Sequence, residues 1–363
     1  MREYLLVLLT AASTTYLLCG MCRRVAIKVG AVAPVRARDV HAVPIPYLGG
    51  LAMLGGVAAA FLLAAQLPFL SRHAVVAHDA RAILIAASVI CVVGVLDDVF
   101  DLPALAKAAG QVLAAGIVVV NGVRMFWIAL PQRIIVLDNA TSILITVIFI
   151  FVCVNAINFV DGLDGLAGGV VAIGGLAFFS YTYLLAHEQD LVLATTASLV
   201  TVTIAGVCLG FLPHNFFPAR MFMGDSGSML LGLLLAASTI SLTGQIDASG
   251  LNARGAGLVT AYLPIVLPFA VLALPLLDLV LAYARRTMNG TWWFVADKQH
   301  LHHRLLQLGH SQTRAALLMY LWTAIISFGA IAVGLAPGWW AVLGLVVALL
   351  VATALTWPRP RRA

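Results

Sequence analysis

Residues 141–165 read TSILITVIFIFVCVNAINFVDGLDG, and this stretch decides the fold class. It begins with an apolar run long enough for a helix that crosses a bilayer, which needs about 20 residues. It ends in the polar residues Asn158, Asp161 and Asp164. The whole chain repeats this pattern, because 62% of its 363 residues are hydrophobic and only 10% are charged. Soluble domains contain roughly 25% charged residues. The composition therefore excludes an ordinary soluble enzyme and predicts an all-α polytopic membrane protein.

The apolar runs predict about eleven transmembrane helices in a single membrane domain, residues 1–363. Their approximate extents are 3–21, 47–67, 82–96, 104–121, 141–157, 166–186, 191–209, 227–243, 257–282, 315–335 and 338–357. An odd number of spans places the termini on opposite sides of the membrane. Short cytoplasmic loops collect Lys and Arg, and fifteen of the 21 basic residues lie inside if the N-terminus is outside. We therefore predict an outside N-terminus and a cytoplasmic C-terminus in the plasma membrane.

With this topology, the unusual polar residues gather at the cytoplasmic ends of different spans. Ionisable groups at a membrane boundary are costly and are usually functional. The predicted cytoplasmic face carries eight aspartates and no glutamate: Asp39, Asp97, Asp98, Asp101, Asp161, Asp164, Asp225 and Asp297. Crowded carboxylates repel one another unless a cation joins them. A set rich in oxygen and free of sulfur suits Mg²⁺ or Mn²⁺, which typically bridges to substrate phosphates.

Two further clusters on this face favour a phosphate-containing substrate. The sequence Gly224-Asp225-Ser226-Gly227-Ser228 is expected to lead into span eight, whose N-terminus would favour an anion. Residues 300–304 read His-Leu-His-His-Arg. These histidines could instead be ligands of a zinc ion, but no cysteine lies near them in the sequence. Binding of phosphate or sugar hydroxyls fits them better, with Arg304 as a fork-shaped anion partner. The basic residues sit at the ends of apolar runs, so no nucleic acid partner is expected.

In their order and spacing, these clusters resemble the polyprenyl-phosphate N-acetylhexosamine-1-phosphate transferases, the membrane family that includes WecA, TagO and MraY. The resemblance covers nearly the whole chain, from residues 36–50 in the first cytoplasmic loop to residues 300–304. The His-Leu-His-His-Arg form is similar to the WecA/TagO branch and implies UDP-N-acetylglucosamine as donor. Such enzymes transfer a sugar 1-phosphate from a UDP-sugar to a polyprenyl phosphate in the membrane and release UMP. The resemblance thus implies a Mg²⁺-dependent active site on the cytoplasmic face.

The resemblance also implies roles for individual residues. Asp225 and Asn158 are expected to bind the metal ion. The residues expected to be catalytic, by orienting or deprotonating the acceptor phosphate or by ordering the site, are Asp97, Asp98, Asp161, Asp164 and His302. The residues expected to bind substrate are Lys107 at the diphosphate, Asn215 and Phe222 near the uracil with Asp164, and His300, His303 and Arg304 over the sugar and diphosphate. Tyr47 stands where many relatives carry a basic residue.

The chain looks like actinobacterial relatives, which implies decaprenyl phosphate as acceptor and the first membrane step of the arabinogalactan linker. Undecaprenyl phosphate and another envelope polysaccharide remain open. Family members often form homodimers, so a homodimer is also implied.

Two other classes of function remain open at this stage. Asp97-Asp98-Val-Phe-Asp101 matches the DDxxD pattern of prenyltransferases, which hold a Mg-diphosphate. A secondary transporter would be the non-enzymatic alternative, but transporters place polar sites near the bilayer midplane and commonly contain inverted repeats. This sequence has its acids at one predicted face and shows no internal repeat.

Overall fold

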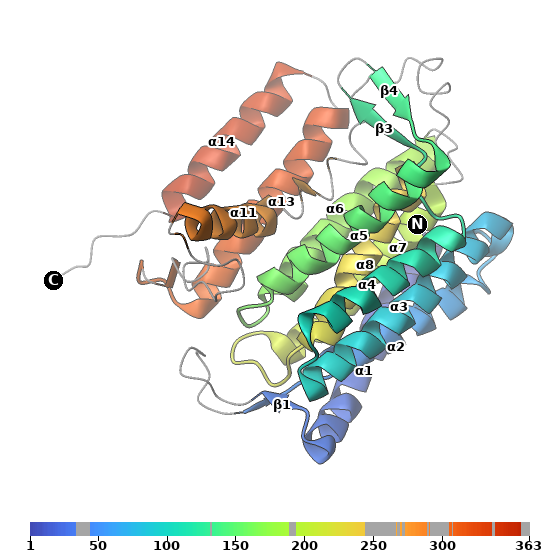
Figure 1. The fold of residues 1–363 in the computed structure, drawn as a ribbon. Coiled ribbons are helices and arrows are strands. Elements are labelled where there is room, and N and C mark those ends of the chain that lie inside the picture. Colours follow the sequence, from blue (N-terminus) through green and yellow to red (C-terminus); the bar gives the residue numbers. More distant parts are fainter. Residues whose placement is uncertain are drawn as a thin grey trace.

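The structure is a computed structural model in which long helices lie side by side (Figure 1). It describes residues 1–33, 44–130, 133–188, 194–243, 273–288, 308–335 and 338–356, together with residues 266, 269, 270, 290, 305 and 306. The helices are α1 (Arg2–Val29), α2 (Gly49–Ala64), α3 (Ala74–Phe100), α4 (Ala104–Val120), α5 (Asn139–Val160), α6 (Leu166–Glu188), α7 (Ala194–Asn215), α8 (Gly224–Thr243), α11 (Ala273–Met288), α13 (Gln312–Leu335) and α14 (Trp339–Thr356). A short 3-10 helix spans Leu70–Arg72.

Two antiparallel strand pairs lie at opposite ends of the bundle. Strand β1 (Val32–Ala33) pairs with β2 (Ile45–Pro46), and β3 (Trp127–Leu130) pairs with β4 (Arg133–Val136). Figure 1 shows β1 at the end where α1 terminates and β3 and β4 at the other end. The two ends of the bundle therefore differ in structure.

Length and hydropathy support the prediction of a helical membrane protein. Within the described ranges, eight helices are long and apolar enough to cross a membrane, namely α1, α3, α5, α6, α7, α8, α13 and α14. Helices α2 and α4 are apolar but shorter. The protein is therefore an integral membrane protein of the all-α class, whereas the count of eleven spans and their orientation remain predictions.

Helices occur at the positions of the predicted spans, but several predicted boundaries are wrong. Helix α1 continues to Val29, beyond the predicted end at residue 21, and α3 begins at Ala74, before the predicted start at residue 82. Helix α7 continues to Asn215, beyond the predicted end at residue 209, and contains Pro213. Helix α8 begins at Gly224 and not at residue 227, so Asp225 lies in its first turn. Helix α11 covers the second half of the predicted ninth span, and most of the first half lies outside the described residues.

Helix α8 forms the centre of the bundle. It is buried along its length and contacts α2, α3, α5 and α7. Small residues allow this close packing, as is usual for membrane helices. A Cβ atom at Gly232 would lie 2.5 Å from Cα of Val154 on α5, so only glycine fits there. Helix α14, by contrast, is almost entirely exposed within the chain. The first turn of α8 is thus held by its neighbours on several sides.

Candidate active site

The ends of α3, α4, α5 and α8 bring charged and polar side chains together at one point. Lys107, in the first turn of α4, lies between two carboxylates. Its Nζ donates a hydrogen bond to Oδ2 of Asp97 at 2.9 Å and another to Oδ2 of Asp225. The three side chains are only partly exposed, at 20% for Lys107, 11% for Asp97 and 28% for Asp225. The predicted convergence of these residues is therefore present in the structure.

Asn158, in the last turn of α5, completes the surroundings of Asp225. Its Nδ2 donates to Oδ1 of Asp225 at 2.6 Å and to Oγ of Ser228 at 2.9 Å. A 180° rotation of the Asn158 side-chain amide would exchange its nitrogen and oxygen, so that Oδ1 would lie where Nδ2 now lies. Asn158 and Asp225 can therefore present oxygen ligands toward one point.

The adjacent residues Asp97 and Asp98 point to different partners. Asp97 accepts a hydrogen bond from the backbone N–H of Leu102 at 2.9 Å, in addition to that from Lys107. Asp98 accepts from the backbone N–H groups of Asp225 and Ser226 and from the Ser226 hydroxyl. Consecutive residues on a helix point about 100° apart, which explains the divergence. Asp97 therefore contacts Lys107, whereas Asp98 contacts the first turn of α8.

The connection between α5 and α6 is fixed by two buried polar side chains. Oδ2 of Asp164 accepts from the backbone N–H of Ala219 at 2.9 Å. Asn215 accepts from the N–H of Gly165 at 3.0 Å and donates to the carbonyl of Met221 at 3.0 Å. Only 4% of Asp164 and 1% of Asn215 are exposed. Both side chains therefore tie the 161–165 turn to the 216–223 segment.

Asp161 begins this turn, outside the helices that can span the membrane. Burial of its carboxyl group raises its pKa to about 8. Repulsion from the carboxylates of Asp225, Asp98 and Asp164 adds to the shift. A positive charge introduced at this site would favour the ionised form of Asp161.

The segment before α8 is also joined to the first loop. The N–H of Phe222 donates to the carbonyl of Pro46, and the N–H groups of Gly49 and Gly50 donate to the carbonyls of Phe222 and Met223. The rings of Tyr47 and Phe222 lie 6.1 Å apart, centre to centre. The first loop therefore helps to position the start of α8, whatever the side chain at residue 47.

The predicted residues His300, His302, His303 and Arg304 lie outside the described residues. Their proposed position over the substrate stays a prediction.

Sequence reasoning singled out the 224–228 cluster but not the partners of its two serines, and it missed Gln111. Ser226 and Ser228 contribute hydroxyl groups in the first turns of α8. Gln111 accepts from Asn155 at 2.8 Å beneath the site and is 1% exposed. It lies four residues after Lys107, on the same face of α4. That spacing, in an otherwise apolar segment, was the available signal.

A metal ion with oxygen ligands fits the side chains present. Within the described ranges, no group of three or more His, Cys, Asp or Glu side chains is arranged to hold a metal ion alone. Mg²⁺, however, is usually held by one or two carboxylates together with waters and substrate phosphates. Asp225 and Asn158 offer such a partial set, without any sulfur ligand. The donor set therefore suits a metal ion that arrives with a phosphate-containing substrate.

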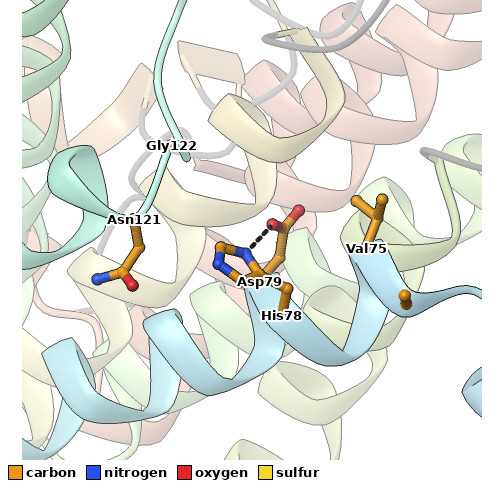
Figure 2. A pocket seen from close by; sticks show the side chains of 6 residues that line it. Val75, His78, Asp79, Asn121 and Gly122 are labelled. Atoms are coloured by element: carbon orange, nitrogen blue, oxygen red, sulfur yellow. Dashed lines mark hydrogen bonds and ion pairs between the residues drawn. The ribbon is translucent and has the colours of Figure 1, made fainter.

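A separate cavity of about 350 Å³ lies near the opposite end of α3 (Figure 2). There Nδ1 of His78 and Oδ1 of Asp79 are 3.4 Å apart, beside Asn121. Asp79 precedes Asp97 by about 27 Å along the helix, at 1.5 Å per residue. This cavity is therefore distinct from the cluster around Asp225.

Comparison with known proteins places the chain in a family. A family model described as glycosyl transferase family 4 matches residues 80–243, which include Asp97, Lys107, Asn158 and Asp225. The chain is 49% identical to decaprenyl-phosphate N-acetylglucosaminephosphotransferase of Mycobacterium tuberculosis over 336 residues, covering 91% of this chain and 82% of that protein. The chain belongs to glycosyl transferase family 4.

Other members of glycosyl transferase family 4 are more distant. A probable undecaprenyl-phosphate N-acetylglucosaminyl 1-phosphate transferase of Bacillus subtilis is 35% identical over 329 residues, covering 90% of this chain and 84% of that protein. An undecaprenyl-phosphate alpha-N-acetylglucosaminyl 1-phosphate transferase of Yersinia pestis is 29% identical over 316 residues, covering 85% and 78%. The family expected from the motifs is confirmed, and the prenyltransferase and transporter interpretations lose their support.

Proposed function

We propose that the protein transfers N-acetylglucosamine 1-phosphate from UDP-N-acetylglucosamine to decaprenyl phosphate. The products would be UMP and decaprenyl-diphospho-N-acetylglucosamine. The observation that carries this proposal is the meeting of Asp97, Lys107, Asn158 and Asp225 at one end of a membrane bundle. The greater identity to a decaprenyl-phosphate enzyme than to the undecaprenyl-phosphate enzymes supports the choice of lipid. The reaction would begin a cell-envelope polysaccharide, the arabinogalactan linker.

In this reaction an oxygen of the acceptor phosphate attacks the β-phosphorus of the donor. The bond between that phosphorus and the oxygen of UMP breaks, and UMP leaves with the electron pair. The second pKa of a phosphate monoester is about 6, so the acceptor is largely ionised at neutral pH. No strong base is required, and Asp97 acts chiefly by holding Lys107 in place.

The chain's own charges match the needs of such a transfer. Lys107 would leave the Asp225 carboxylate and pair with the donor diphosphate, because transferred phosphoryl groups require nearby cations. Mg²⁺ or Mn²⁺, held by Asp225 and Asn158, would neutralise the diphosphate charge that develops. Asp164 and Asn215 would hold the 161–165 turn in place beside the part of the site that binds uracil, next to Phe222. His300, His302, His303 and Arg304 would close over the sugar and diphosphate.

The proposal includes the orientation in the membrane. The site would face the cytoplasm, which supplies the UDP-sugar, and the chain would cross the membrane about eleven times with its N-terminus outside. The excess of Lys and Arg in the predicted inside loops supports this orientation. A homodimer is proposed on the family resemblance alone. Cysteine labelling of intact cells at residue 28 and residue 133 would test the orientation, since only the second should react from outside.

The reaction itself is tested with two labels. Purified protein in detergent receives UDP-N-acetylglucosamine labelled in the sugar or in the β-phosphate, with decaprenyl phosphate, with and without Mg²⁺. Both labels should enter the lipid and UMP should be released only with metal. Entry of the sugar label without the phosphate label would contradict the proposal.

A further inference from the structure

Asp98 is joined to the first turn of α8 by three hydrogen bonds. Oδ1 accepts from the N–H of Asp225 at 2.7 Å. Oδ2 accepts from the N–H of Ser226 at 3.2 Å and from its hydroxyl at 2.9 Å. The first N–H groups of a helix have no partner within that helix. Asp98 therefore acts as the N-terminal cap of α8, although it belongs to α3.

Three glycines surround this cap, and a Cβ atom at any of them would clash with neighbouring atoms. Gly224 has a φ of +69°, and a Cβ atom there would lie 2.4 Å from Oδ2 of Asp98. Gly94, one turn before Asp98, would place a Cβ atom 2.3 Å from Cα of Ser226. Gly50 on α2 would place one 2.2 Å from the backbone N of Gly227. Three glycines thus bring α2 and α3 against the turn that carries Asp225.

In this position the Asp98 carboxylate is engaged by the first turn of α8. Each of its oxygens already accepts a hydrogen bond from α8, whereas Lys107 bonds to Asp97. That Asp98 deprotonates the acceptor phosphate stays a prediction, whereas its contact with α8 is present in the structure.

We propose that Asp98 is a positioning residue, which sets the place of the Asp225 carboxylate by capping α8 from the neighbouring helix. The inference rests on the proposed metal-dependent transfer at this site. It predicts that loss of the cap weakens metal binding, because the metal ligand Asp225 is one of the two residues whose N–H groups are capped. Changes to residues that orient metal ligands typically cost 10- to 100-fold in affinity.

The test is Mn²⁺ binding, measured without substrate by electron paramagnetic resonance of the free ion. Asp98→Ala should raise the dissociation constant about 10-fold or more. Asp98→Asn keeps one acceptor oxygen and should raise it less, and Ser226→Ala removes only the hydroxyl bond and should have the smallest effect. The matched control is Asp138→Ala, which removes the side-chain cap of α5 at its other end. It should lower the unfolding temperature without changing Mn²⁺ affinity.

Transfer activity separates positioning from proton acceptance. Asp98→Asn should retain measurable transfer with the wild-type pH profile, and excess Mn²⁺ should restore part of the activity lost in Asp98→Ala. If Asp98→Ala does not fold, the comparison of Asp98→Asn with Ser226→Ala decides. Equal Mn²⁺ affinity in all folded variants, or no Mn²⁺ binding by the wild type, would overturn the inference. If Mn²⁺ binding changes as expected but the wild type transfers no sugar phosphate, the proposed function fails and the positioning role stands.

Discussion

Lys107 provides the sharpest prediction about the site, because it is the cation that bonds to both Asp97 and Asp225. We expect Lys107→Met to lower kcat about 100- to 1,000-fold. A hydrogen bond between charged groups contributes about 1.5–3 kcal/mol. Two such bonds to the donor diphosphate in the transition state, each near the lower end of that range, would supply about 3–4 kcal/mol, which corresponds to the stated loss of rate. Removal of one positioned donor from an oxyanion hole has a similar effect, about 10²–10³-fold.

The same variant should not weaken metal binding. Lys107 donates to Oδ2 of Asp225, so its removal frees an oxygen that the metal ion can use. The assay is transfer of labelled sugar phosphate at saturating substrates, combined with a Mn²⁺ titration of the same preparation. The matched control is Lys28→Met, which removes an exposed lysine from the last turn of α1. A Lys107→Met enzyme with a kcat within about threefold of the wild type would refute the reasoning. The two hydrogen bonds would then stabilise the transition state by less than about 1 kcal/mol.

Two further predictions concern packing and pH. Gly94→Ala should lower both the unfolding temperature and the transfer rate, because the new Cβ would meet backbone atoms of Ser226. Gly116→Ala meets nothing within 4 Å and should be neutral or slightly stabilising. Thermal unfolding in detergent compares the stability of the two variants. Equal stability of the two variants would contradict the packing argument. The raised pKa of Asp161, about 8 against an ordinary 3.8, means that the metal-free folded state keeps a proton that the unfolded chain loses. Stability should therefore fall as the pH rises from about 4 to 8, and Asp161→Asn should reduce this fall when unfolding temperatures are compared in EDTA. An identical pH dependence in the variant would show that Asp161 does not cause it.

Periodicity and composition predicted the membrane helices well, because a run of apolar residues has few alternatives in a bilayer. They placed the ends of α7 and α8 wrongly. Asp225 and Ser226 remain helical because Asp98 on another helix caps them, and this partner is invisible in the local sequence. The predicted seventh span ends at residue 209, yet α7 continues through Pro213 to Asn215.

The sequence predicted which residues form the candidate site, but not which groups each of their side chains contacts. The carboxylates and Lys107 were expected to meet, since unusual polar residues cluster at the ends of apolar runs. Asp97 bonds to Lys107 and Asp98 bonds to α8, and this difference depends on which helix each side chain faces. Asn215 was expected at the uracil, but in the structure its amide bonds to backbone groups of Gly165 and Met221. Such roles depend on tertiary contacts, which a single sequence does not specify.

The central claim is that the cluster around Asp225 carries out sugar-phosphate transfer with a metal ion. The most direct measurement compares wild type and Asp225→Ala for transfer of the β-phosphate label of UDP-N-acetylglucosamine to decaprenyl phosphate over a Mg²⁺ titration. The account predicts metal-dependent labelling of the lipid by the wild type and none by a folded Asp225→Ala protein at any Mg²⁺ concentration. Turnover of Asp225→Ala at the wild-type rate, or labelling by the wild type without metal, would contradict it.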